Sequence, residues 1–303
     1  MNQNRFLLNF GSITFVSIVL FVLFIALPFI GNNWYVLELS KEWLAQFDKN
    51  QINIDIAPEP KPNQDNNEPA EIVTWSWTDF EGNNNNISVK IKNSSIEGAK
   101  SNRLNCLATE DIYGELYKYD VEFLDEFIIQ LKNKMTEKNM DYITCIEYVC
   151  SAVQSINYTL ILSSNGVEYP ANSGNYVKCP CDLPFGSFSD ECSSNSANGC
   201  CNNVDPIGVY SPLEFFSKKT GDCDTRALFA YTILHKLGFN VAVMTSESQW
   251  HSVLGINLPD SESSGLPYGE AENGDIFTLY ELTSKTWRLG HNVEGNDWRA
   301  VLH

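Results

Sequence analysis

Two runs of alternating apolar and polar residues open the patterned part of this 303-residue chain. Residues 72–78 alternate around Val73, Trp75 and Trp77, and residues 87–92 alternate again after an Asn-rich turn. Alternation with a period of two is typical of a strand with one buried face, so the two runs predict a β-hairpin. We expect its tryptophans to be buried in the core rather than to bind a ligand.

A helical period replaces the alternation after residue 120. Apolar residues recur every three or four positions in 121–135 and again in 146–156. This spacing predicts two amphipathic helices, joined near Lys138.

The last hundred residues predict a helix and several strands. A helix is expected to follow Cys223 and to end near Gly238, because glycine is a common C-terminal stop. Short apolar runs predict strands at 239–244, 252–256 and 276–283. We therefore expect an α+β fold in which a helix packs against an antiparallel sheet.

The N-terminus carries a long apolar segment. Residues 13–30 contain no charge and are numerous enough to cross a bilayer of roughly 30 Å. A cleaved signal peptide is the alternative, but the run is longer than a usual signal core and no small-x-small cleavage site follows. We expect residues 11–31 to be an uncleaved transmembrane signal anchor after a short cytoplasmic tail at 1–10. With Arg5 as the charge before it, the positive-inside rule places the rest outside the cytoplasm, in the periplasm or extracellular space.

Composition divides the remaining chain into three parts. Residues 32–70 contain a juxtamembrane segment and a spacer rich in Pro and Asn, which cannot form a core. A region with the hairpin follows at 71–119, and it either extends the sheet of the next domain or forms a small module. The main domain is expected at 120–303. A Cys-rich insertion at 163–205, without apolar periodicity, interrupts it.

Nine cysteines are a high number for a chain of this length. If Cys223 is a reactive thiol, eight remain, enough for four disulfides, which suits an oxidising compartment. Five of them lie in the insertion: Cys179, Cys181, Cys192, Cys200 and Cys201. Zinc usually needs two well-spaced pairs such as Cys-x-x-Cys, so we favour local disulfides over a metal there. No metal and no cofactor are expected.

The formal net charge is −18, from 38 acidic and 20 basic residues. Such a surface repels phosphate backbones and argues against nucleic acid as a partner, while it favours solubility.

One segment combines a cysteine with the signals of a helix start. Gly221 permits a tight turn, and Asp222 is a residue type that opens helices, so Cys223 is expected at a helix N-terminus. Unpaired amides there favour a thiolate and can bond an oxyanion. Asp222 and Asp224 oppose the thiolate, so a base is needed nearby.

The best candidate base among the four histidines is His251. His235 falls on the same predicted helix as the cysteine, His291 follows a glycine in a predicted loop, and His303 is the last residue. His251 opens a predicted strand, which is a rigid mount for an imidazole.

A third polar residue is expected to orient the imidazole. Glu281 lies on the next predicted strand, where an acid in an apolar run is costly to bury unless it has a partner. Asp275 is the reserve candidate. Gln249 and Trp250 precede the base and are expected to line the substrate cleft, with a packing role for Trp250 left open.

This order of residues resembles the transglutaminase-like superfamily, in the form of a membrane-anchored, bacterial-type member. The similarity covers about residues 120–290 and includes 221–226, 211–215 and the predicted helix at 145–158, with the Cys-rich insertion as a departure. It implies a papain-like core with a Cys-His-Asp triad in that chain order. Glu281 stands at the acid position, where the family more often has Asp.

The resemblance also implies a reaction. Cys223 would attack an amide carbonyl of a peptide or protein and form a thioester, while His251 would take the thiol proton and pass it to the leaving amine. No residue decides whether water or an amine then receives the acyl group. The alternative is a transglutaminase-like scaffold without catalysis at the cell envelope. We favour the enzyme because all three triad positions are filled.

Overall fold

The structure is a computed structural model that describes residues 68–163, 201–259, 263, 265–291 and 293–303. The predicted anchor at 11–31 and most of the insertion at 163–205 lie outside the described residues. The described residues belong to one compact unit. Within the described ranges, no helix is both long and apolar enough to cross a membrane.

The predicted hairpin is present as strands β1 (Ala70–Thr78) and β2 (Asn84–Lys92). The strands are antiparallel, and Trp75 lies opposite Ile87. One face is buried along both strands, because the side chains of a strand alternate between its two sides. Trp75 and Trp77 both lie on this buried face, as predicted.

The buried face of the hairpin joins the helical core. The Trp75 ring stacks on Phe216 and Phe229 with centroid separations of 5.6 and 5.1 Å. Its Nε1 donates a hydrogen bond of 2.9 Å to the Phe216 carbonyl oxygen. The hairpin remains a two-stranded sheet of its own. Neither expected arrangement, an extension of the main sheet or a separate module, is therefore found.

Helices surround this core. The α-helices before α8 in the described residues are α3 (Asn93–Asn105), α4 (Ile112–Asp120), α5 (Asp125–Glu137), α6 (Tyr142–Gln154) and α7 (Pro212–Lys218). The apolar stripe of α5 is buried, as the period predicted. Asp141 caps α6, because its side chain accepts from the Thr144 backbone N–H. The predicted pair of helices and the junction between them are thus confirmed.

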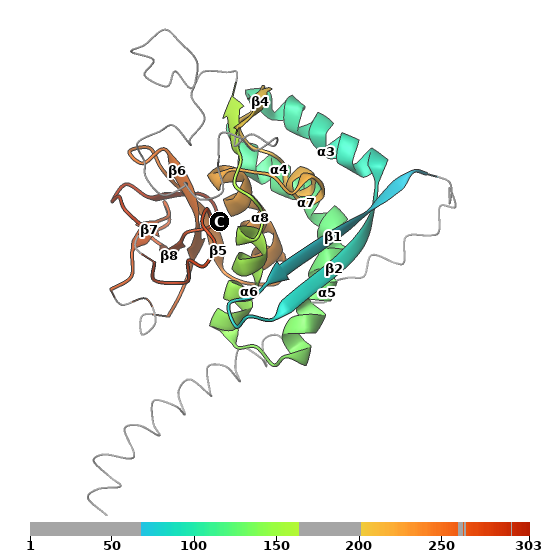
Figure 1. Ribbon diagram of the computed structural model, residues 1–303. Coiled ribbons are helices and arrows are strands. Elements are labelled where there is room, and N and C mark those ends of the chain that lie inside the picture. Colours follow the sequence, from blue (N-terminus) through green and yellow to red (C-terminus); the bar gives the residue numbers. More distant parts are fainter. Residues whose placement is uncertain (1–67, 164–200, 260–262, 264, 292) are drawn as a thin grey trace, which may run out of the picture. The chain divides into compact units, whose positions relative to one another are not determined.

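Helix α8 (Cys223–Lys236) lies at the centre of the compact unit. Figure 1 shows the hairpin on one side of α8 and strands β5 (Val241–Ser246) and β6 (His251–Ile256) on the other. The helix ends before Gly238, whose φ of 91° is a left-handed value that glycine adopts without strain. The predicted start and stop of this helix are confirmed.

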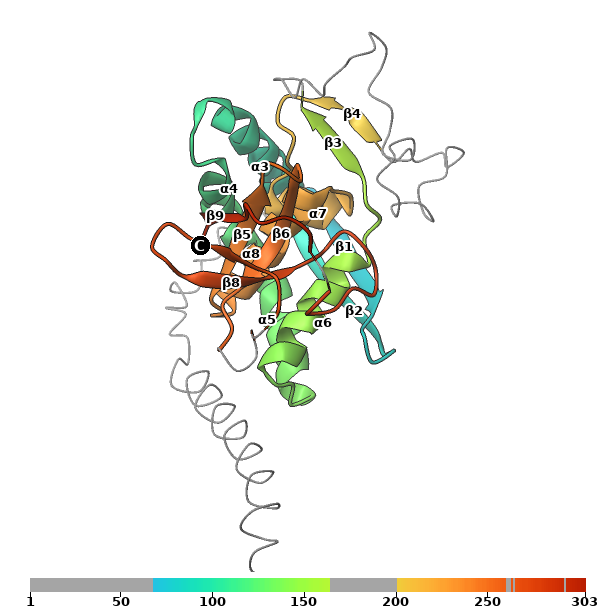
Figure 2. The same cartoon turned by 90° about the vertical axis from the view of Figure 1, so that its left-hand side faces the viewer.

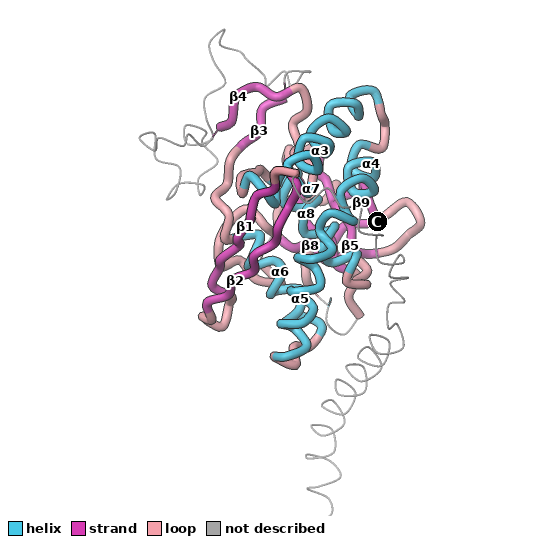
Figure 3. The backbone as a smooth tube through the Cα atoms, turned by 90° about the vertical axis from the view of Figure 1, so that its right-hand side faces the viewer, coloured by secondary structure: helices cyan, strands magenta, loops and turns pink. Residues whose placement is uncertain are grey.

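The C-terminal strands close into a barrel. Its other strands are β7 (Tyr268–Glu270), β8 (Ile276–Tyr280) and β9 (Arg299–Leu302). The order is β5-β6-β8-β7-β9, and β9 pairs with β5 to close the sheet. Met244, Val253, Phe277 and Trp298 belong to the apolar cluster of the barrel. Figure 3 shows β9 and the C-terminus beside α4.

Two further strands flank the Cys-rich insertion. β3 (Leu160–Ser163) and β4 (Cys201–Asp205) pair in parallel and form a separate sheet. Figure 2 shows this pair beyond α7, apart from the barrel. The sequence pattern does not predict this pair, because a short parallel pair carries no local period that distinguishes it from a loop.

The unpaired cysteines of the described chain correct one expectation. Cys106, Cys145 and Cys150 are buried and unpaired. Four disulfides among the eight cysteines other than Cys223 are therefore not formed, and that expectation is wrong. Cys145 and Cys150 lie on α6 and fill its buried side, and burial raises the pKa of Cys145 to about 12. They act as small apolar packing residues.

Candidate active site

Cys223 is the first residue of α8, and the chain before it is tightly packed. The Asp222 side chain accepts from the Thr225 backbone N–H at 3.3 Å and from its hydroxyl at 2.9 Å, which caps the helix. A Cβ on Gly221 would lie 2.6 Å from Thr225 Cγ2 and 2.8 Å from Phe215 Cδ2. Glycine is therefore required at this position because a larger side chain would not fit between Thr225 and Phe215.

The start of β6 lies against the start of α8. The backbone N–H of Ser252 donates to the Cys223 sulfur. The Ser252 hydroxyl donates to Asp224 Oδ1, and the Cys223 thiol donates to the same oxygen at 3.6 Å. Ser252 directly follows His251, so the backbone at the predicted base lies beside the start of the helix that carries the predicted nucleophile. Asp224 and Asp222, which flank Cys223, are also close enough to His251 to raise its pKa.

His251 is hydrogen-bonded to Glu281. The distance from His251 Nε2 to Glu281 Oε2 is 2.6 Å. Leu254 lies opposite Tyr280 in the antiparallel pair of β6 and β8, so the pairing of the two strands ends directly before Glu281. This bond engages Nε2 and leaves Nδ1 as the other nitrogen of the ring.

Glu281, and not the reserve candidate Asp275, is the carboxylate that bonds His251. Asp275 is occupied in a turn, where its Oδ2 accepts from Asn273 Nδ2 at 2.8 Å. The predicted strand at 276–283 also ends early, at Tyr280. Glu281 Oε1 accepts from the backbone N–H groups of Leu282 and Thr283, both at 2.9 Å, and these bonds turn the chain away from the sheet.

The charges of the pair follow from these contacts. Burial raises the pKa of Glu281, but the hydrogen bond to His251 and the bonds from Thr283 outweigh it and bring the pKa below its usual value. Burial lowers the pKa of His251, but Glu281 outweighs that effect and the pKa stands above 6.5. Glu281 is thus an ionised acceptor that favours the charged imidazole.

The surroundings of the thiol oppose its ionisation. Burial is the largest cause that raises the pKa of Cys223 well above its usual value, and the charges of Asp224 and Asp222 raise it further. The Ser252 N–H acts in the opposite direction but does not offset them. The two flanking aspartates thus oppose the thiolate, as the sequence predicted, and a thiol with a raised pKa needs a base to act as a nucleophile.

Trp250 and Gln249 precede the base at the surface. Trp250 is 72% exposed, so the packing alternative for its side chain does not hold. Its backbone φ of 49° lies in the left-handed region, which is costly for a bulky residue. Asp297 fixes this turn, because it accepts from the Ser248 backbone N–H at 2.9 Å and from the Ser246 hydroxyl at 2.5 Å.

Several residues around the site had not been identified from the sequence. Tyr113 on α4 hydrogen-bonds the Ser252 side chain, and burial, then Asp224 and Cys223, raise its pKa. Arg226 and Gln154 bond the backbone beside Glu281. Arg226 carries a usable signal, since a charged residue directly before the apolar run at 227–231 falls in a buried part of the helix. Tyr113 and Gln154 carry none, because their roles depend on segments far apart in sequence.

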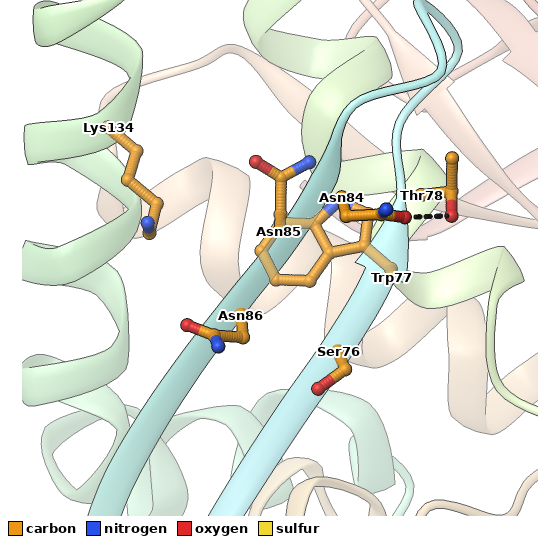
Figure 4. Close-up of a pocket in the computed structure, with 7 residues that line it drawn as sticks. All are labelled: Ser76, Trp77, Thr78, Asn84, Asn85, Asn86 and Lys134. Atoms are coloured by element: carbon orange, nitrogen blue, oxygen red, sulfur yellow. Dashed lines mark hydrogen bonds between the residues drawn. The ribbon is translucent and has the colours of Figure 1, made fainter.

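A hollow on the hairpin is separate from this site. Figure 4 shows its lining residues, which are Ser76, Trp77, Thr78, Asn84, Asn85, Asn86 and Lys134. None of the candidate catalytic residues lines it. It therefore gives no support to the predicted site.

The comparisons with known proteins add no relative. No family model, no curated protein and no solved structure matches the chain. Within the described residues, no group of His, Cys, Asp and Glu side chains is arranged to hold a metal ion.

Proposed function

We propose that this chain is a transglutaminase-like cysteine enzyme that acts on peptide or protein amides through Cys223, His251 and Glu281. The observation that carries the proposal is the 2.6 Å hydrogen bond between His251 and Glu281, made beside a helix-terminal cysteine. A nucleophile, a base and a residue that orients the base form the usual set for acyl transfer.

The reaction proceeds in two stages. As Cys223 Sγ bonds to the carbonyl carbon, its proton passes to His251 Nδ1. The tetrahedral intermediate then expels the amine, which takes that proton, and a thioester remains. Water or a second amine attacks the thioester and gives a proton back through His251, so that the thiol is restored. Glu281 stabilises the imidazolium in both stages.

The surroundings of the nucleophile supply the remaining functions. Backbone amides at the N-terminus of α8, including that of Cys223, are the proposed donors to the oxyanion. Exposed Trp250 and Gln249 are the proposed substrate contacts. Residues 11–31 are the proposed membrane anchor, which would hold the enzyme outside the cytoplasm near peptide or protein substrates. The proposal includes no cofactor and no nucleic acid.

Alkylation of the detergent-solubilised full chain tests the proposal. We expect iodoacetamide to modify Cys223 in preference to buried Cys145 and Cys150, at a rate that depends on pH. His251→Ala should slow this modification by about 10²-fold or more, the usual scale of general base catalysis. His291→Ala is the matched control and should leave the rate unchanged. The rates of Cys223 alkylation are measured by peptide mapping. Equal rates in His251→Ala and His291→Ala would show that His251 is not the base.

One observation favours a second function. Cys223 is only 9% exposed and its pKa is raised, which suits a scaffold that no longer catalyses. A glutamine-containing peptide and a fluorescent primary amine distinguish the two functions. Product that forms with the wild-type chain and disappears in Cys223→Ala supports the enzyme. Hydrolysis of the peptide by the wild-type chain but not by Cys223→Ala supports the enzyme equally. If the wild-type chain and Cys223→Ala bind the peptide equally and neither turns it over, the scaffold is supported.

A further inference from the structure

Arg226 occupies an unusual position for a charged side chain. It lies in α8, three residues after Cys223, and is 1% exposed. Its guanidinium donates to three backbone carbonyl oxygens, those of Gly221 at 3.2 Å, Leu282 at 2.9 Å and Ile156 at 2.5 Å. The guanidinium carbon also lies 5.4 Å from the centre of the Tyr158 ring.

These carbonyls belong to the segments that build the site. Gly221 leads into the cap of the nucleophile helix, and Leu282 directly follows Glu281. Ile156 follows α6. One planar side chain therefore connects the turn before the thiol, the turn after the acid and the end of a third element, with the fixed fork geometry of a guanidinium.

Gln154 provides a second connection to the acid. Its side-chain Nε2 donates to the Glu281 carbonyl oxygen at 2.9 Å and to the Trp287 carbonyl oxygen at 2.8 Å. Gln154 is 2% exposed. The main chain on both sides of the peptide bond from Glu281 to Leu282 is thus held by buried side chains.

A buried guanidinium is expensive to maintain. Burial is the largest cause that lowers the pKa of Arg226, to about 10, although neighbouring negative groups oppose it. An apolar side chain of similar volume would avoid that desolvation cost. Packing alone is therefore a poor reason for an arginine here, whereas the joining of three main-chain segments is a sufficient one.

We infer that Arg226 is a positioning residue that fixes the acid of the site relative to the nucleophile, with Gln154 as its partner. The inference rests on the proposed function. Arg226 fixes the position of the turn after Glu281 relative to Gly221, and so keeps the Glu281 carboxylate hydrogen-bonded to His251. It touches no substrate.

Arg226→Gln in the full-length protein tests this role. We expect the pKa of His251, followed by NMR of the ring protons, to fall toward the lower value that burial favours. We also expect iodoacetamide alkylation of Cys223 to slow by up to about 10²-fold, the effect of a misplacement of roughly 1 Å. Gln154→Met should change both quantities in the same direction, and it provides the test if Arg226→Gln does not fold.

Arg103→Gln is the matched control. Arg103 is also 1% exposed, but it bonds Glu214 at 2.5 Å and Asp205 at 2.6 Å and makes none of the contacts of the site. The control should lower the melting temperature without changing the pKa of His251. An equal change of that pKa in the control would make the effect a general loss of stability and overturn the inference.

Arg226→Lys separates charge from geometry. Lysine keeps the positive charge but has no planar fork to reach three carbonyls. We expect the defect to persist in this variant. Wild-type behaviour of Arg226→Lys, or an unchanged pKa of His251 in folded Arg226→Gln, would overturn the positioning role. If Cys223 is alkylated at the same rate in the wild type and in His251→Ala, the proposed function is contradicted instead. The NMR titration of His251 would still test whether Arg226 positions Glu281.

Discussion

Glu281 shows how one side chain can serve both the site and the local fold. Its Oε2 bonds His251, while its Oε1 accepts from two backbone N–H groups and from the Thr283 hydroxyl at 2.7 Å. The side chain of a glutamate is one methylene longer than that of an aspartate. That length allows the carboxylate to fold back on its own turn and still reach the ring.

The first prediction at this scale concerns Glu281→Gln. Glutamine keeps the shape but loses the charge, so the pKa of His251 should fall below its wild-type value, toward or below 6.5. In the wild type the folded-state pKa exceeds the unfolded one. The pairing therefore adds stability below the unfolded pKa, and this gain is lost as pH rises through the folded value. The variant should lack that pH dependence.

NMR titration of His251 and urea unfolding across a pH series measure these effects. Asp275→Asn is the control, because Asp275 also carries a carboxylate near β8 but bonds Asn273 in a turn. A pKa of His251 that is equal in the wild type and in Glu281→Gln would contradict the assigned pairing.

At the scale of elements, the hairpin contributes to the core through one large side chain. Trp75 is 1% exposed, and its ring also lies 5.5 Å from that of Phe127 on α5. Since Phe216 belongs to α7 and Phe229 to α8, the residue joins the hairpin to three helices. The hairpin is consequently part of the support of the nucleophile helix.

We predict that Trp75→Ala lowers the free energy of unfolding by about 3–5 kcal/mol, the usual cost of truncating a buried aromatic. The measurement is urea denaturation followed by circular dichroism. Ile72→Ala on the same strand is the control, because Ile72 is 73% exposed and such changes stay within about 0.5 kcal/mol. A single transition with similar midpoints for both variants would mean that the hairpin packs only loosely.

At the scale of the whole molecule, α8 separates two differently built halves. Its one side meets aromatic residues of the hairpin and helices, and its other side meets the barrel strands. The proposed site forms where the N-terminus of α8 meets the start of β6. Cys223 belongs to the separating helix itself, while His251 opens one barrel strand and Glu281 directly follows another.

The proposed anchor gives a prediction that concerns the full chain. Leu20→Arg combined with Phe24→Arg should release the protein from membranes, because each charge near the centre of a span costs about 2.5–3.5 kcal/mol on an insertion scale. Alkaline carbonate extraction of membranes from expressing cells measures the release. Leu37→Arg with Leu39→Arg is the control outside the span. A wild-type chain that is itself extracted would argue against the anchor.

The sequence by itself determined the local elements that carry the chemistry. A period of two defined the hairpin, a helical period defined α5 and α6, and the capping aspartate placed Cys223 at the start of α8. These features depend on neighbours within a few residues, which a reader of the sequence can see. The position of His251 at the start of a strand followed in the same way.

Only the tertiary structure decided how those elements act together. The closure of the barrel, the choice of Glu281 over Asp275 and the three carbonyls around Arg226 all join segments far apart in the chain. The raised pKa of Cys223 is of the same kind, because burial is its largest cause and burial is a property of the packed molecule. Local patterns fix what each segment is, whereas desolvation and distances between segments exist only once the chain has folded.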